Sequence, residues 1–257
     1  MLRSIVKERE QRPGPFPFFP AFVLLLAAML VPACRTVPTP SYRPANRETY
    51  LSEISSLLAR QWPKNRTVTI VCHGHSVPAG YFKTPVVDTF NAYPHLLHKS
   101  LKERFPHAVL NVIVTAIGGE NADAGAKRYE KDVLALHPDV VTIDYALNDR
   151  AIGLARAEAA WRSMITNALR NGVKVILLTP TPDLRANLDD PADPLNQHAE
   201  QIRNLAREYG VGLADSMAAF RAHTFAGGQL EDLMVQGNHP NRKGHDLVVG
   251  ELLKWFP

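Results

Sequence analysis

Residues 67–80 decide how this chain folds; they read Thr67-Val-Thr-Ile-Val-Cys-His-Gly-His-Ser-Val-Pro-Ala-Gly80. The first five residues are all β-branched, and polar residues and glycine follow them. A continuous run of this kind predicts a strand covered on both faces, as in a parallel sheet, because a half-exposed strand would alternate. Ser76 would then lie beyond the carboxyl end of that strand, where open α/β sheets bind their ligands.

The same pattern recurs along the chain. Strands are predicted at residues 67–71, 110–115, 140–144, 174–178 and 211–214. Amphipathic helical stretches separate them, and the last helix is predicted to run from after Pro240 to Trp255. This alternation implies right-handed crossovers and therefore an α/β fold, a doubly wound three-layer α/β/α sandwich. Residues 183–196, rich in aspartate and proline, are predicted to form a surface loop.

Composition indicates one folded domain preceded by a targeting segment. The chain has 257 residues, of which 46% are hydrophobic and 21% charged, as in ordinary α/β domains. Residues 1–33 combine a basic head, a short apolar run and small residues, which predicts a signal peptide. Cys34 then stands where a bacterial lipoprotein carries its lipid, although Pro32 departs from that pattern. Residues 34–45 form a proline-containing tether, and 46–257 form the domain.

The segment could be cleaved as an ordinary signal peptide or processed as a lipoprotein signal. Both alternatives predict an exported protein, either an envelope lipoprotein or a periplasmic or secreted protein. Residues 1–33 carry four basic and two acidic side chains, so the net charge falls from +4 to about +2 without them. No cluster of basic residues with interleaved aromatics remains, so nucleic-acid binding is not expected. Membrane contact is expected only through a lipid on Cys34, and the oligomeric state stays open.

Four kinds of residue follow the predicted strands at the same edge of the sheet. They are a serine within residues 72–80, a glycine turn within 116–121, an asparagine within 145–150 and a histidine within 237–241. Acyl transfer needs such a set, namely a nucleophile, a base to take its proton, and neutral donors for the oxyanion.

These segments resemble the conserved blocks of the SGNH (GDSL-like) hydrolases. Gly74-His75-Ser76 resembles the first block, and Gly119, Asn148 and His239 match the later blocks in the family order. The resemblance implies a flavodoxin-like, five-stranded parallel sheet of order 2-1-3-4-5 and a serine-dependent esterase without a cofactor. It also implies that Ser76 is the nucleophile and His239 its base. The N–H groups of Ser76 and Gly119 and the side chain of Asn148 would form the oxyanion hole.

Two positions depart from the family pattern. The family has aspartate three residues before the histidine, where this chain has Gln236. Glu231 or Asp232 could supply the acid instead, or a backbone carbonyl could orient the histidine in a dyad. His75 replaces the aspartate that usually precedes the nucleophile.

Other residues are weaker candidates. Tyr81 and Phe82 are expected to line one wall of the cleft, and His75 and Arg150 are further candidates for substrate contact. His73 and His75 form a His-x-His pair that could bind zinc, but no carboxylate or cysteine at suitable spacing completes such a site. No metal is therefore expected.

Two hypotheses of function remain. The first is an exported hydrolase of carboxylic esters whose substrate is a small-molecule or carbohydrate ester, for example a carbohydrate O-deacetylase or a lipid esterase. The second is a non-catalytic glycan-binding module that lost its acid at position 236. All four family residues are present, which favours catalysis.

Overall fold

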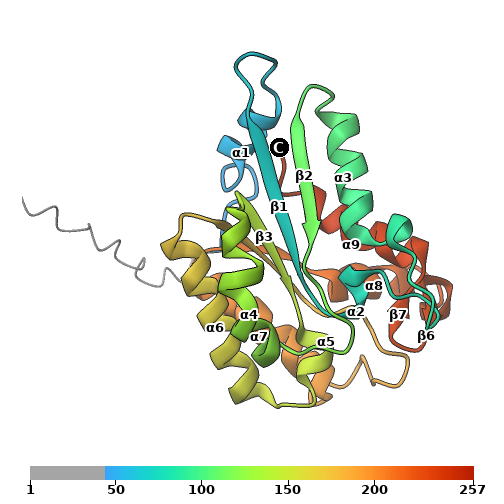
Figure 1. Ribbon diagram of the computed structural model, residues 1–257. Helices are drawn as coiled ribbons and strands as arrows, with labels where there is room; N and C mark the ends of the chain where they lie inside the picture. The colour runs from blue at the N-terminus through green and yellow to red at the C-terminus, as the bar shows by residue number, and fades with distance from the viewer. Residues whose placement is uncertain (1–43) are drawn as a thin grey trace, which may run out of the picture. The chain divides into compact units, whose positions relative to one another are not determined.

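The computed structural model describes residues 44–257, and its centre is a five-stranded parallel sheet of order β2-β1-β3-β4-β5 (Figure 1). This order confirms the predicted doubly wound α/β fold. The strands are β1 (Thr67–Gly74), β2 (Val109–Val114), β3 (Val140–Asp144), β4 (Lys174–Leu178) and β5 (Gly212–Ala214). β1 is longer than predicted because its pairing with β3 continues to Gly74. The predicted signal peptide (1–33), Cys34 and most of the tether (34–45) lie outside the described residues.

Helices cover both faces of the sheet (Figure 1). One face carries α1 (Ser52–Leu58), α3 (Tyr93–Arg104) and α9 (Arg242–Leu253), and the other carries α4 (Ala122–Asp132), α6 (Leu154–Arg170) and α7 (Pro194–Tyr209). Each face has its own apolar core, one around Leu97 and Phe256 and the other around Trp161. Among the described residues, no helix has both the length and the apolar character needed to span a bilayer.

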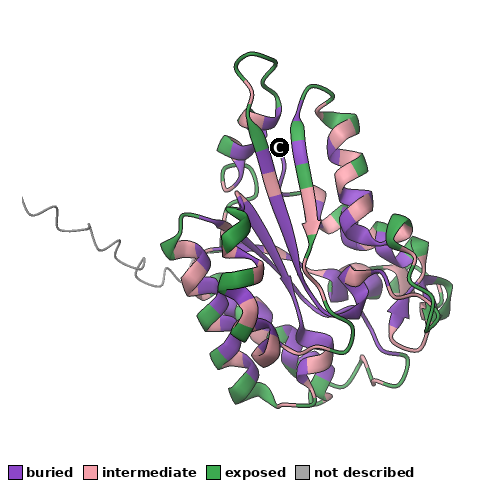
Figure 2. Cartoon of the chain, in the orientation of Figure 1, coloured by how far each residue is buried: buried purple, intermediate pink, exposed green. Residues whose placement is uncertain are grey.

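Burial along the strands follows their place in the sheet (Figure 2). All residues of β3 are buried, as are all of β4 except its first, so the unbroken apolar runs there do reflect two covered faces. β2 differs, because it is an edge strand and only Leu110 is fully buried.

Several short elements were not predicted. They are α2 (Ser76–Ala79), α5 (Ala146–Asp149), α8 (Ser216–Phe225), the antiparallel pair β6 (Met234–Gln236) and β7 (His239–Pro240), and 3-10 turns at Thr89–Asn91, Leu134–Leu136 and Leu230–Leu233. The last helix begins at Arg242, because Pro240 belongs to β7 and Asn241 caps the helix by accepting the N–H of Gly244. It ends at Leu253, two residues before the predicted end.

The segment predicted as a surface loop is only partly one. Asp183, its first residue, is fully buried beneath the sheet edge, whereas most of the residues from 184 to 194 are exposed or half-buried. The composition of the segment did not distinguish Asp183, or Leu195 and Asn196 in the first turn of α7, from the exposed residues between them.

Candidate active site

Ser76 and His239 meet beyond the carboxyl end of β1. Ser76 is the first residue of α2, directly after the strand, and His239 lies on β7. The Ser76 Oγ and the His239 Nε2 are 3.0 Å apart, and both residues are almost completely buried. Two residues separated by 163 positions are thus within hydrogen-bond distance.

The backbone carbonyl of Phe82 orients the imidazole of His239. His239 Nδ1 lies 2.8 Å from that carbonyl oxygen. A carbonyl can only accept a hydrogen bond, so Nδ1 carries the proton and Nε2 is left to accept the hydroxyl of Ser76. Burial lowers the pKa of His239 from its ordinary value of 6.5, with the Phe82 carbonyl acting in the opposite direction. The ring is therefore held as a neutral base facing the serine.

Within the described part of the chain, none of the three side chains considered as the partner of His239 makes a hydrogen bond to it. The Gln236 Oε1 accepts the N–H of Thr84 at 2.9 Å, and the Asp232 Oδ2 accepts the N–H of Gln229 at 3.1 Å. Glu231 is exposed in the 3-10 turn. Of the alternatives left open by the sequence, the structure favours the backbone carbonyl.

The candidate oxyanion donors come from the segments that follow three different strands. Gly119 has a φ of +77°, in the left-handed region that favours glycine, and a Cβ there would meet nothing within 4 Å. Within residues 44–257, neither its N–H nor that of Ser76 donates a hydrogen bond to another residue. The Asn148 Nδ2 lies in α5 and donates one hydrogen bond to the carbonyl of Glu120 at 2.9 Å. A primary amide has two N–H groups, so the second stays available.

His75 does not line the cleft, and that expectation is wrong. The side chain is fully buried, and its Nδ1 accepts the N–H of Val77 at 3.2 Å, which makes it the N-cap of α2. Its Nε2 lies 3.3 Å from the Asp144 Oδ1, and its Nδ1 lies 3.4 Å from the Ser76 Oγ. Because an aspartate at this position could accept the same N–H, the histidine substitutes for it as a helix cap.

Arg150 has a protein partner, which corrects its assignment to substrate contact. Its Nη2 lies 2.7 Å from the buried Asp183 Oδ2, and its Nε donates to the carbonyl of Leu147. Arg185 binds the same carboxylate. Arg150 therefore ties the loop after β3 to the loop after β4.

Tyr81 and Phe82 both contact His239, the first through its ring and the second through its backbone carbonyl. The Tyr81 ring is 6.2 Å from the His239 ring, between centroids, and it packs so closely on Gly118 that a Cβ there would come within 2.8 Å. The Phe82 ring stacks on the buried His245 at 5.2 Å, so this residue meets the site through its carbonyl.

The sequence reasoning missed three groups around the site. They are the carbonyl of Phe82, the carboxylate of Asp144 beneath His75, and the carboxylate of Asp183 against Arg150. The first leaves no sequence signal, because every residue has a carbonyl. Asp144 ends a predicted strand and Asp183 lies in the segment that follows another, and that position was the one available signal.

The described residues contain no group of three or more histidine, cysteine, aspartate or glutamate side chains placed to hold a metal ion. His73 and His75 each have their own protein partners, Thr115 for the first and Val77 for the second.

The chain is thus an α/β protein with a serine and a histidine in contact beyond its strand ends, which is an arrangement that serine hydrolases use. The chain belongs to the GDSL-like lipase/acylhydrolase family, whose sequence model matches residues 72–247. It is accordingly an enzyme that hydrolyses ester bonds.

Solved structures share this fold at low sequence identity. The acetylxylan esterase Axe2 from Geobacillus stearothermophilus is 22% identical with a TM-score of 0.65, over 74% of this chain and 94% of that one. A two-domain esterase active on acetylated mannans is 19% identical with a TM-score of 0.66, over 85% of this chain and 54% of that one. No curated protein sequence matches the chain significantly.

Proposed function

We propose that the chain is a serine esterase in which Ser76 forms an acyl-enzyme and His239 is the general base. The observation that carries this proposal is the 3.0 Å contact between the Ser76 Oγ and the His239 Nε2, with Nδ1 held by the Phe82 carbonyl. His239 takes the serine proton as Oγ attacks the ester carbonyl, and returns it to the leaving alcohol. Water then attacks the acyl-enzyme with the same histidine as base.

The oxyanion would be held by the N–H groups of Ser76 and Gly119 and by the second N–H of the Asn148 amide. The two backbone donors have no other partner in the described residues. The donors belong to the segments that follow β1, β2 and β3, and the Asn148 amide is already held by the carbonyl of Glu120. One such donor is typically worth about 10²–10³ in kcat.

The substrate class that we propose is an acetylated carbohydrate. Support comes from two structurally similar proteins, an acetylxylan esterase and an esterase active on acetylated mannans. We also propose export, with residues 1–33 as the signal peptide and Cys34 as a lipidation site. The order of residues in that segment is the support for this part.

The experiment that tests the proposal compares the purified chain with its Ser76→Ala variant. We expect the wild type to hydrolyse p-nitrophenyl acetate and to release acetate from acetylated xylan or mannan. Ser76→Ala should lose at least 10³-fold in kcat, because the oxyanion donors and binding alone leave only residual catalysis.

Equal turnover by the two proteins would reject Ser76 as nucleophile. Turnover of octanoate esters but not of acetylated glycans would reject the carbohydrate substrate and keep the serine mechanism. No turnover by either protein, with glycan still bound, would favour the non-catalytic binding module.

A further inference from the structure

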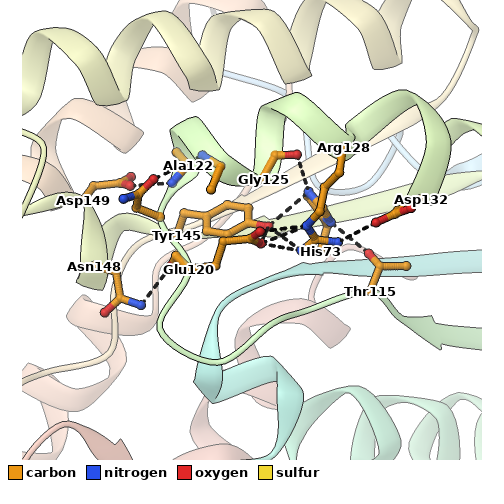
Figure 3. A network of polar contacts seen from close by, with 12 residues as sticks. His73, Thr115, Glu120, Ala122, Gly125, Arg128, Asp132, Tyr145, Asn148 and Asp149 are labelled. Atoms are coloured by element: carbon orange, nitrogen blue, oxygen red, sulfur yellow. Dashed lines mark hydrogen bonds and ion pairs between the residues drawn. The ribbon is translucent and has the colours of Figure 1, made fainter.

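A buried polar cluster lies behind the loops that carry Gly119 and Asn148 (Figure 3). It consists of His73, Glu120, Arg128 and Tyr145, and we call it the Tyr145 cluster. Its members come from β1, from the loop after β2, from α4 and from the residue before α5. The mechanism proposed above uses none of them directly.

The centre of the cluster is the hydroxyl of Tyr145. It donates to the Glu120 Oε2 at 2.8 Å and accepts from the Arg128 Nη2 at 3.1 Å. Arg128 also binds Glu120 directly, with Nε at 2.9 and 3.0 Å from the two carboxylate oxygens. Tyr145 is fully buried, and the side chains of Glu120 and Arg128 are only 11% and 16% exposed. Water therefore screens this ion pair weakly.

His73 completes the cluster as a neutral imidazole. Burial and the positive charge of Arg128 lower the pKa of His73 to about 4. Its Nε2 lies 3.2 Å from the carbonyl of Gly125, which can only accept, so Nε2 carries the proton. Nδ1 then accepts the hydroxyl of Thr115 at 2.8 Å. Both ring nitrogens of this buried side chain thus have partners.

Each side of the cluster is joined to a candidate oxyanion donor. Glu120 directly follows Gly119, and its carbonyl accepts the Nδ2 of Asn148 at 2.9 Å. The backbone carbonyl of Tyr145 accepts the N–H of Asn148 at 3.0 Å. Glu120 and Tyr145 are hydrogen-bonded to each other by their side chains, so a closed ring of hydrogen bonds links Glu120, Tyr145 and Asn148, and Gly119 adjoins this ring through its peptide bond to Glu120.

We propose that Glu120 and Tyr145 are positioning residues that set the separation of the Gly119 N–H and the Asn148 amide. This inference rests on the proposed function. Oxyanion donors act because they are fixed in advance where charge develops, and a displacement of about 1 Å is enough to cost about 10²-fold. Glu120 and Tyr145 each have a side chain in the cluster and a carbonyl that holds Asn148, Glu120 by the side-chain Nδ2 and Tyr145 by the backbone N–H.

Two variants test the proposal, and each has a matched control. Tyr145→Phe removes one hydroxyl and keeps the ring, and Glu120→Gln removes the charge and keeps the size. Tyr50→Phe removes a hydroxyl that bonds only the backbone of Val175, and Glu208→Gln breaks a comparable ion pair with Arg162 on α6. Both controls lie outside the catalytic machinery and should keep the wild-type kcat.

We expect both cluster variants to lose about 10- to 100-fold in kcat for p-nitrophenyl acetate, with KM changed less than about twofold. The inhibition constant of phenylboronic acid should rise by a similar factor, because its tetrahedral adduct on Ser76 places an oxygen among the same donors. The melting temperature of each variant is measured alongside.

A purely structural role for Glu120 and Tyr145 predicts a change in stability without a change in kcat. A lower melting temperature with unchanged kcat and boronate affinity would overturn the proposal, as would a higher KM at unchanged kcat. If Glu120→Gln does not fold, Tyr145→Phe alone decides. Failure of the proposed function is recognised separately, because Ser76→Ala would then retain the wild-type rate.

Discussion

His239 has a partner at each ring nitrogen, and one of these partners is a carbonyl where serine hydrolases often have a carboxylate. The Phe82 carbonyl fixes the tautomer and the ring direction as well as a carboxylate would. It brings no full negative charge, so it stabilises the imidazolium less. This weaker stabilisation of the imidazolium affects the pKa of His239, and therefore the pH at which the base becomes neutral.

We predict that kcat/KM falls on the acid side with a half-maximal point below pH 6.5. His239 must be neutral to act, and burial lowers its pKa from 6.5. Activity is therefore complete above the lowered pKa and is lost as the pH falls through it. The measurement is a pH–rate profile with p-nitrophenyl acetate.

The control for this profile is Tyr50→Phe, which alters no group at the site. An acid limb centred at pH 7 or above would contradict the prediction, because it would indicate that a carboxylate faces the imidazole.

At the scale of elements, His239 depends on the hairpin β6–β7 and on the loop between α2 and α3. Gln236 on β6 accepts the N–H of Thr84, and the turn carbonyl of Gly237 accepts the N–H of Leu184 from the loop after β4. The residue at the family's acid position thus fastens the loop that carries the Phe82 carbonyl. Its effect on the base is indirect.

We predict that Gln236→Ala lowers kcat/KM by no more than about 10-fold. The substitution removes one partly exposed hydrogen bond, worth about 1 kcal/mol, and leaves the His239–Phe82 contact in place. In the serine-protease template, by comparison, converting the triad aspartate to its amide costs about 10⁴ in kcat. Steady-state kinetics with p-nitrophenyl acetate measures the difference.

Gln201→Ala is the matched control. The side chain of Gln201, on α7, donates a hydrogen bond to the carbonyl of Leu154 on α6 and makes no hydrogen bond to His239. A loss of 10³-fold or more in Gln236→Ala alone would show that Gln236 itself orients the imidazole.

At the scale of the whole molecule, the buried carboxylate of Asp183, in the loop after β4, binds Arg150 from the segment after β3 and Arg185 from its own loop. Burial alone would raise the pKa of Asp183, but Arg185 and Arg150 outweigh it and hold that pKa well below its ordinary value of 3.8. The carboxylate therefore contributes to the free energy of unfolding while it is ionised. That contribution is present above about pH 4 and is lost as the pH falls further.

We predict that Asp183→Asn lowers the free energy of unfolding by about 1–3 kcal/mol at pH 7. The difference from wild type should shrink toward pH 3, because Asp183 is protonated there in the unfolded chain while it stays ionised in the folded protein. Urea denaturation at the two pH values measures it.

Asp189→Asn, in the exposed part of the same segment, is the control and should change stability by less than about 0.5 kcal/mol. A difference in Asp183→Asn that stays constant between pH 7 and pH 3 would contradict the assigned ion pair.

Much of the fold could be predicted from local patterns. β3 and β4 have the predicted bounds, and the order 2-1-3-4-5 followed from the family resemblance. α4 and α8 were missed because few of their residues are buried: Ala122, Gly125 and Tyr129 in the first, and Ser216, Met217 and Phe220 in the second. A helix with so narrow an apolar stripe has little periodicity to detect.

In the candidate site, the four family residues could be predicted from the sequence, whereas their contacts could not. Ser76, Gly119, Asn148 and His239 could be named from the sequence, because each follows a strand or precedes a helix and the blocks come in a recognisable order. The partners of His239, His75 and Arg150 could not. Phe82 and His239 are 157 positions apart and Arg150 and Asp183 are 33 apart, and the contacts depend on a carbonyl or on one carboxylate among many. Local sequence specifies elements through periodicity, whereas such pairings arise only when the packed loops bring the two groups together.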